Sequence, residues 1–152
     1  MAKLRHIAIT VPDPHKAAEF YMQAFGMKKV GETDWSNARG VYLSDGTINL
    51  ALLNYRTEEA AGERGCGFFG LHHIGFWVDD VKVAREAVEA AGGQYWMGEP
   101  VEGGGFYEIK YHDPNGVVVD LTANGWGGAV KDVVAAETRA AEALEAEPAA
   151  GV

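Results

Sequence analysis

Hydrophobic and polar residues alternate in two stretches of the chain that correspond position by position. Residues 6–13 read HIAITVPD, and residues 73–80 read HIGFWVDD. In the first stretch every second residue from Ile7 to Val11 is a branched apolar one, which predicts a β-strand. Each stretch ends in an aspartate, Asp13 or Asp80, and a glycine follows at the same distance in each half, Gly26 or Gly93. We therefore interpret the chain as an internal duplication.

An amphipathic helix is predicted after each of these strands. Asp13 is suited to cap the first helix, with Pro14 at the first helical position and Gly26 just past the end. The expected apolar face of the first helix has the spacing i, i+3, i+4, i+7 and consists of Ala17, Phe20, Tyr21 and Ala24. The matching face in the second half is Ala84, Ala87, Val88 and Ala91, followed by Gly92 and Gly93.

Three short strand patterns, separated by glycine or Asp-Gly turns, follow each helix. They lie near residues 28–31, 40–43 and 47–53 in the first half and near 94–97, 106–111 and 117–122 in the second. The plan is therefore βαβββ twice, an α+β fold. We expect one domain over residues 1–126, with modules over 4–56 and 71–125 joined by a linker over 57–70.

The Ala- and Glu-rich tail has a weaker pattern than the rest of the chain. A sparse apolar stripe over residues 129–147 predicts a C-terminal helix, and residues 148–152 are expected to fray. The region 127–152 is thus assigned as a helix and frayed end outside the domain. Whether this helix packs on its own chain or on a partner chain stays open.

Composition excludes several classes of function. The chain has 152 residues, a net charge of −9 and one cysteine, Cys66. The acidic balance is unsuited to nucleic acid or to an anionic membrane surface. One cysteine permits neither an internal disulfide nor a CxxC zinc site. Neither a signal peptide nor a spanning apolar run is visible, so a cytoplasmic location is expected.

Two histidines and one aspartate are the candidate metal ligands. His6 and His73 open equivalent strands, and a pseudo-twofold between the halves would bring them to one cavity. Asp120 interrupts an apolar run, where an ionised carboxylate is costly unless it is paired or bound to metal. Together they would form a facial triad that favours Fe²⁺ and also suits Mn²⁺, Ni²⁺, Co²⁺ or Zn²⁺. Open coordination positions would let a substrate oxygen bind the ion.

Structural roles for these residues are the alternative interpretation. A histidine at a strand start is more often a surface or hydrogen-bonding residue, and Asp120 could pair with an arginine. Counting from the turn places Leu50 at the first-half position that matches Asp120, and alternation turns Asn49 to the other face. The duplication thus predicts three protein ligands rather than four. By the same alternation His72 should face away from His73, towards solvent or an interface.

The pattern resembles the vicinal oxygen chelate superfamily, which includes glyoxalase I, bleomycin-resistance proteins, methylmalonyl-CoA epimerase and extradiol dioxygenases. The resemblance covers residues 4–125 and is carried by residues 6–13, 20–27, 71–76 and 113–121. It implies an incomplete eight-stranded barrel around a metal cavity and, on family grounds, a homodimer. The segments are specific for the fold and weak for the reaction, because the superfamily hosts many chemistries.

The resemblance also assigns roles to the candidate residues. The histidine positions of the family fall on His6 and His73, and its final-strand acid, usually Glu, falls on Asp120. The fourth ligand of the glyoxalase and epimerase branches would fall on Leu50, which argues against glyoxalase I activity. A three-ligand set is similar to the dioxygenase branch, or to lyases and isomerases that leave more positions free.

The expected function is a metal-dependent dioxygenase or lyase/isomerase that acts on a small substrate with two vicinal oxygens. Glu108 is the catalytic candidate, because Glu108 and Lys110 interrupt a strand and either could be a base or a substrate clamp if it faces inward. Trp126 is expected at the cavity mouth. The alternative is a metal-free protein of the bleomycin-resistance kind that binds and sequesters a small molecule.

Overall fold

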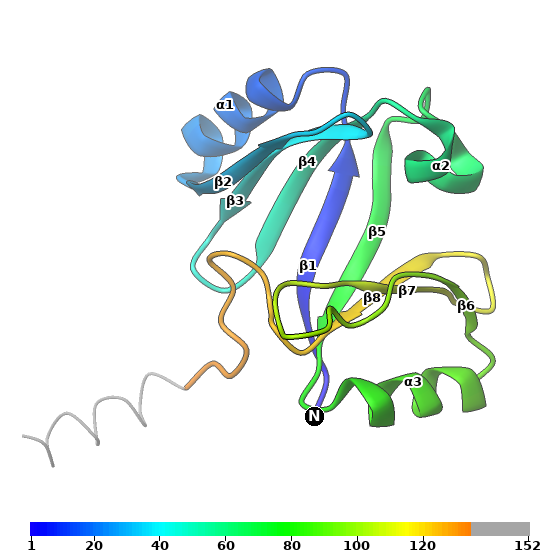
Figure 1. Cartoon of the computed structure of the whole chain (residues 1–152). Helices are drawn as coiled ribbons and strands as arrows, with labels where there is room; N and C mark the ends of the chain where they lie inside the picture. The colour runs from blue at the N-terminus through cyan, green and yellow to red at the C-terminus, as the bar shows by residue number, and fades with distance from the viewer. Residues whose placement is uncertain (135–152) are drawn as a thin grey trace, which may run out of the picture.

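The computed structural model describes residues 1–134 as two βαβββ units that share one mixed sheet (Figure 1). The first unit consists of β1 (Lys3–Thr10), α1 (Pro14–Phe25), β2 (Lys28–Asp34), β3 (Ala38–Ser44) and β4 (Asn49–Tyr55). The second consists of β5 (Gly70–Trp77), α3 (Val81–Ala90), β6 (Gln94–Met97), β7 (Ile109–His112) and β8 (Val118–Thr122). The duplication and the α+β class predicted from the sequence are therefore confirmed.

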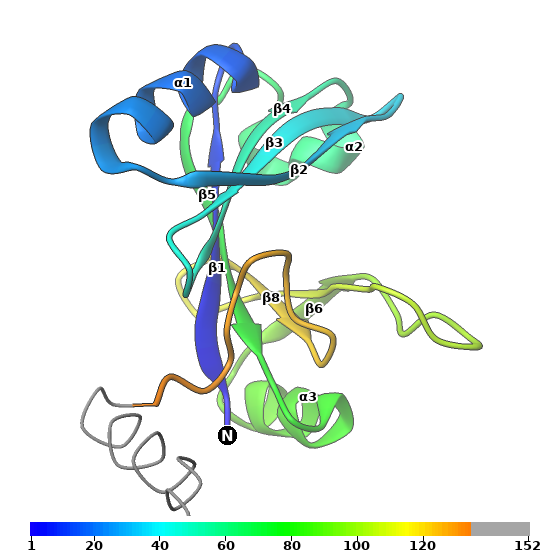
Figure 2. The same ribbon diagram turned by 90° about the vertical axis from the view of Figure 1, so that its left-hand side faces the viewer.

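The two units meet along their first strands. The strand order is β2-β3-β4-β1-β5-β8-β7-β6, and β1 pairs antiparallel with β5. Each first strand also pairs parallel with the last strand of its own unit, β1 with β4 and β5 with β8. Figure 2 shows β1 and β5 running between the units, with α1 and α3 at opposite ends of the molecule. The sheet is open, since β2 and β6 are its two edges.

Both long helices begin at a capping aspartate, as the sequence predicts for the first of them. The Asp13 carboxylate accepts hydrogen bonds from the backbone N–H groups of His15 and Lys16. Asp80 caps α3 in the same way, through Lys82 and Val83. Such caps satisfy backbone donors that have no partner within the helix. The two aspartates are thus equivalent in the structure as well as in the sequence.

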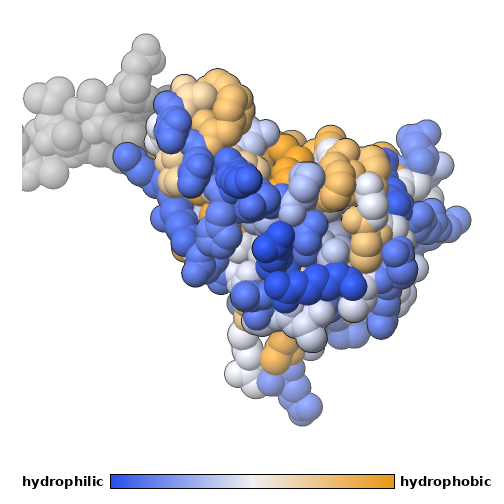
Figure 3. All heavy atoms as spheres, turned by 90° about the horizontal axis from the view of Figure 1, so that it is seen from above, coloured by the Kyte–Doolittle hydropathy of each residue, from blue (hydrophilic) through white to orange (hydrophobic). Residues whose placement is uncertain are grey.

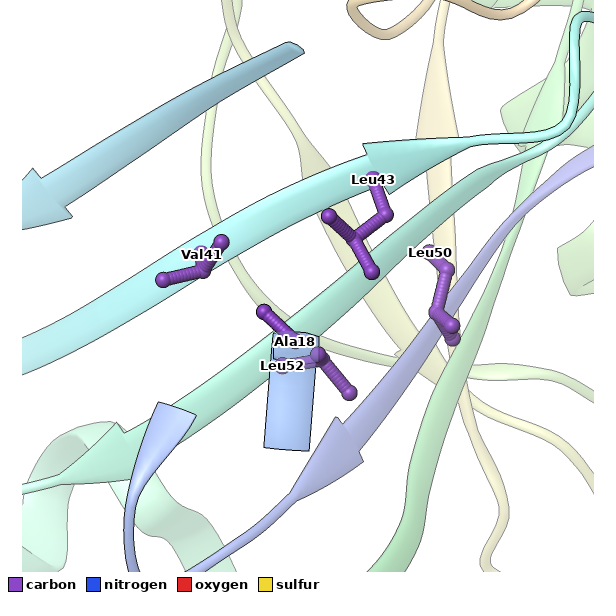
Figure 4. Close-up of a cluster of buried hydrophobic side chains, with 5 residues drawn as sticks. All are labelled: Ala18, Val41, Leu43, Leu50 and Leu52. Carbon is purple, nitrogen blue, oxygen red and sulfur yellow. The ribbon is translucent and has the colours of Figure 1, made fainter. Parts of the chain in front are cut away.

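Each unit has its own apolar core between its helix and its strands. Figure 4 shows the cluster beneath α1, formed by Ala18, Val41, Leu43, Leu50 and Leu52. The second cluster is formed by Val78, Ile109, Tyr111 and Leu121. The predicted face of α1 was wrong at Phe20 and Ala24, which are exposed, whereas Ala17, Ala18 and Tyr21 contact the core. The buried face of α1 is therefore rotated about the helix axis relative to the face that the sequence predicted.

Several segments differ from the sequence prediction. The predicted linker contains a short helix, α2 (Glu58–Ala61), and one 3₁₀ turn, η1 (Gly62–Arg64). The penultimate strand begins at Ile109 rather than near Phe106. Residues 129–134 are not helical, and the remainder of the predicted C-terminal helix lies outside the described residues. Among residues 1–134, no helix is long and apolar enough to cross a membrane.

Candidate metal centre

Three strands bring His6, His73 and Asp120 together. All three side chains are buried, and one potential ligand atom from each lies within 4.8 Å of the others. The Nε2 atoms of the two histidines are 3.2 Å apart. His73 Nε2 is 3.3 Å from Oδ2 of Asp120. The sequence prediction that these residues converge therefore agrees with the geometry.

A β-bulge just before each histidine helps to set its direction. The pairing of β1 with β5 shifts register between Leu4 and His6, and again where Ala8 pairs with His73. Between the bulges His6 lies opposite Gly75. The two histidines thus hold mirror positions in one antiparallel ladder, as a local twofold requires. Bulges re-aim side chains and are common beside functional sites.

The second bulge overturns the expectation for His72. Strand alternation predicted that this side chain would face away from His73. The ladder instead skips His72, and both neighbouring imidazoles are buried. Their Nδ1 atoms are 2.8 Å apart, and His72 Nε2 is 2.8 Å from the carbonyl oxygen of Ala61. Because α2 lies in the linker, the connection between the units also contributes to the site.

The structure also corrects the predicted phase of β4. Leu50 lies in the core beneath α1, whereas Asn49 faces the site. In the first unit His6 pairs with Asn49 and Ala8 pairs with Ala51. In the second unit Gly75, which holds the position equivalent to Ala8, pairs with Asp120. Ala51 is therefore the first-unit equivalent of Asp120, not Leu50. Alanine has no ligand atom, so the expectation of three protein ligands is unaffected.

Hydrogen bonds fix which nitrogen of His6 carries the proton. Asn49 donates its amide N–H to the carbonyl oxygen of Gly127, so its Oδ1 faces His6. An oxygen at 2.8 Å accepts, so Nδ1 of His6 is the donor. In a neutral imidazole the other nitrogen, Nε2, then carries a lone pair. Burial lowers the pKa of His6 to about 4, which keeps the ring neutral near pH 7.

The same reasoning applies to His73 through His72. The Ala61 carbonyl accepts from His72 Nε2–H, so Nδ1 of a neutral His72 accepts from Nδ1–H of His73. Burial lowers the pKa of both histidines. The Nε2 of His73 therefore also carries a lone pair. The two Nε2 lone pairs therefore face each other at 3.2 Å, and they repel unless a proton or a metal ion lies between them.

Asp120 completes a donor set that suits a cation. Its Oδ2 accepts a hydrogen bond from the Lys110 ammonium, while Oδ1 is a buried atom with no hydrogen-bond partner among the described residues. Buried polar atoms rarely lack a partner. Burial raises the pKa of Asp120 to about 7. Two imidazole nitrogens and a free carboxylate oxygen are ligands that fit a divalent transition metal.

Glu108, Lys110 and Trp126 form the polar wall beside this cluster. Trp126 Nε1–H donates to Oε1 of Glu108 at 2.7 Å, and Lys110 Nζ donates to Oε2 at 3.3 Å. Burial opposes ionisation of Glu108, but the Lys110 charge prevails and lowers the pKa of its carboxyl group. Burial likewise opposes the Lys110 charge, and Asp120 and Glu108 prevail and raise its pKa. Both side chains are therefore charged near pH 7.

Trp126 also covers the first histidine. Its indole stacks on the His6 ring with centroids 4.8 Å apart and an angle of 8° between the planes. The stack is possible because β5 has a glycine at position 75, where a Cβ would lie 2.7 Å from the indole. The sequence placed Trp126 at the cavity mouth, and the structure places it against a predicted ligand. The Gly75 of the HIGF motif is thus a packing requirement.

A cavity of about 450 Å³ opens onto this cluster. It is bounded by both units, and His6, His73, Glu108, Lys110 and Trp126 are among its lining residues. The β4 residues on this side alternate regularly and are Asn49, Ala51, Leu53 and Tyr55. Polar and ionisable side chains from both halves thus converge on one cavity that is open to solvent and can admit a small molecule.

Comparison with known proteins assigns the family. Residues 3–121 match the Glyoxalase/Bleomycin resistance protein/Dioxygenase superfamily, and the chain belongs to this family. A probable lactoylglutathione lyase of Vibrio parahaemolyticus is 27% identical over 128 residues, which covers 80% of this chain and 91% of the relative. An ethylmalonyl-CoA/methylmalonyl-CoA epimerase of Cereibacter sphaeroides is 29% identical over 131 residues, covering 80% and 97%.

Other relatives are longer, and solved structures share the fold. A lactoylglutathione lyase of Arabidopsis thaliana is 32% identical over 129 residues, covering 79% of this chain but only 44% of the relative. A methylmalonyl-CoA epimerase of Streptomyces coelicolor, solved with 2-nitronate-propionyl-CoA, is 23% identical with a TM-score of 0.65, covering 78% and 94%. A hypothetical protein of Bacillus halodurans is 24% identical with a TM-score of 0.64, covering 79% and 92%.

Proposed function

We propose that the chain is a metal-dependent enzyme in which His6, His73 and Asp120 hold a divalent ion. The observation that carries this proposal is the pair of facing Nε2 atoms, one of which lies 3.3 Å from Oδ2 of Asp120, while Oδ1 of that carboxylate is buried with no hydrogen-bond partner among the described residues. A divalent ion held by the two histidines and Asp120 would bind both nitrogen lone pairs and a carboxylate oxygen, whereas a proton shared between the two nitrogens leaves the Oδ1 atom without a partner. A bound ion would act there as a Lewis acid towards a substrate oxygen. Fe²⁺ stays the favoured ion, with Mn²⁺, Ni²⁺, Co²⁺ and Zn²⁺ as alternatives.

Glu108 is the proposed base of this enzyme. Its carboxylate lines the cavity, and its two oxygens are held by Trp126 and Lys110. Since the Lys110 charge keeps the group ionised, Glu108 is ready to accept a proton from a substrate in the cavity. We propose a substrate with two vicinal oxygens and either dioxygenase or lyase/isomerase chemistry. The homodimer expected on family grounds stays a prediction.

Metal content after purification without a histidine tag tests the proposal. Wild-type protein is expected to contain close to one equivalent of metal, and His6→Ala and Asp120→Asn are expected to lose most of it. His15→Ala, which changes an exposed histidine of α1, is the matched control. Full metal retention by His6→Ala would contradict the site and favour a metal-free binding protein. Oxygen consumption with catechol then separates dioxygenase from lyase/isomerase chemistry.

A further inference from the structure

Aromatic side chains form much of the cavity wall beyond the metal cluster. The five rings that line the cavity are Trp35, Tyr42, Tyr55, Phe106 and Trp126. Trp35 and Phe106 are 66% and 56% exposed, so these two rings are available where the cavity meets solvent rather than packed in a core. Aromatic walls of this kind favour flat apolar ligands, which gain stacking as well as burial.

Free positive charge is missing from this wall. Within the part of the chain that the structure describes, Glu108 and Lys110 are the charged residues that line the cavity. The Lys110 ammonium is already bound to Asp120 and Glu108. Arg56 contacts the backbone of the lining residue Trp35, but its guanidinium is paired with Asp34 at 2.7 Å. An anionic ligand would therefore find no unpaired cation along the lining.

The charge of the whole molecule also disfavours anionic ligands. Its net charge is −9, so it repels polyanions at long range. On the face shown in Figure 3, hydrophilic side chains predominate and apolar ones gather in patches among them. Carriers such as coenzyme A and glutathione bear phosphate or carboxylate groups that are costly to desolvate without a paired cation. The cavity is thus poorly matched to the thioesters named for several relatives.

We infer that the substrate is an uncharged aromatic molecule of one or two rings, rather than a coenzyme A or glutathione thioester. This inference rests on the proposed function only for the direction of the substrate, whose oxygens would face His6, His73 and Asp120. The rings of Phe106 and Trp35 would hold its aromatic body near the mouth. The substrates named for the relatives do not transfer to this chain, because the cationic groups that would bind them are absent from the described lining.

Calorimetric titration of the full chain with 2-naphthol, acetyl-CoA and S-methylglutathione tests the inference. The titrations are run with zinc and after its removal, so that ligand binding and metal binding are measured separately. We expect 2-naphthol to bind at least about tenfold more tightly than either thiol derivative in both forms. Phe106→Ala should weaken 2-naphthol about three- to tenfold, through lost stacking. Phe25→Ala, which removes an exposed ring of α1 outside the cavity, should not.

A gain-of-binding variant completes the test. Ala60→Arg places a guanidinium on α2 at the cavity lining and should raise the affinity for acetyl-CoA while leaving 2-naphthol nearly unchanged. Equal or tighter wild-type binding of either thiol derivative, or no binding of 2-naphthol, overturns the inference. Binding of 2-naphthol by a protein that takes up no metal would refute the proposed metal enzyme and leave the inference about ligand class standing.

Discussion

The proton positions on the two candidate ligands depend on neighbours that are not themselves candidate ligands. Asn49 sets the tautomer of His6, and His72 sets that of His73. Each of these neighbours is in turn oriented by a backbone carbonyl, from Gly127 and Ala61 respectively. Such outer partners fix ring orientation and raise ligand basicity. The site is therefore built from at least two layers of side chains.

Replacing the outer partner of His73 should weaken metal binding. His72→Phe keeps a ring in place but removes the acceptor for His73 Nδ1–H, so either tautomer of His73 becomes available. We expect zinc affinity to fall about 10–100-fold, the usual effect of such a change. Competition with a chromophoric chelator measures it. His15→Phe, at an exposed position of α1, is the control, and equal affinities for the two variants would contradict the role given to His72.

Acid should destabilise the metal-free protein through His6. Burial lowers the pKa of this residue from 6.5 to about 4, so the folded state binds the proton less readily than the unfolded chain. This stabilising contribution is complete above pH 6.5 and is lost as the pH falls towards 4. Asp120 acts in the opposite sense, because its raised pKa removes stability as the pH rises from 3.8 to about 7.

Urea unfolding of wild type and His6→Gln in the presence of a chelator isolates this effect. Between about pH 7 and about pH 4.5 the wild type should lose about 2 kcal/mol more unfolding free energy than the variant. Asp120 is present in both proteins, so its opposing contribution cancels to first order. A pH dependence that is the same in both proteins would show that His6 is not buried in its neutral form.

At the scale of the elements, β5 carries the tightest packing constraint of the site. Gly75 lies opposite His6, and a Cβ there would be 2.7 Å from the Trp126 ring and 2.9 Å from Cβ of His6. Gly75→Ala should therefore lower the unfolding free energy by about 1–3 kcal/mol, as overpacking does. It should also displace the indole, which tryptophan fluorescence reports.

The control for this change is Gly67→Ala. A Cβ at Gly67 meets nothing within 4 Å, and its backbone does not have the positive φ that penalises side chains. This variant should unfold within about 0.5 kcal/mol of wild type. If both alanine variants behaved alike, the contact between Trp126 and β5 would not be the constraint that the geometry indicates.

The elements also show what a sequence can predict and where it stops. Alternation and capping identified the strands, the helix starts and the repeat, because those signals are local. The phase of a strand is not local. The bulge at His72 and the turn before Asn49 each changed which residues face the cavity, and one position separates Leu50 in the core from Ala51 at the site. Pairing between distant strands decides this, and a single sequence does not record it.

On the scale of the whole molecule, the duplication has become asymmetric at the site. Both units supply a histidine from their first strand, but only the second supplies an acid from its last strand. The first unit has Ala51 at that position, fully buried and facing the cavity. A three-ligand centre leaves more positions open to substrate than a symmetric four-ligand centre would. The two halves therefore differ chemically at the site, with alanine in the first where the second has an acid.

Restoring the symmetry should convert the centre to four ligands. By the strand register, Ala51→Asp places a carboxylate at the first-unit position that is equivalent to Asp120. Without metal, the extra buried acid should lower the unfolding free energy by about 1–3 kcal/mol. With zinc, the added ligand should raise metal affinity by about tenfold or more, so the variant should gain more from zinc than wild type does.

Thermal unfolding with and without zinc measures both effects in one experiment. Ala51→Asn is the matched control, because it has nearly the same shape and lacks the charge. A larger zinc-induced rise in melting temperature for Ala51→Asp than for Ala51→Asn is expected, since only the carboxylate adds a negative ligand. The same rise in the two variants would mean that position 51 does not reach the ion, and the twofold relation between the ligand sets would then be wrong.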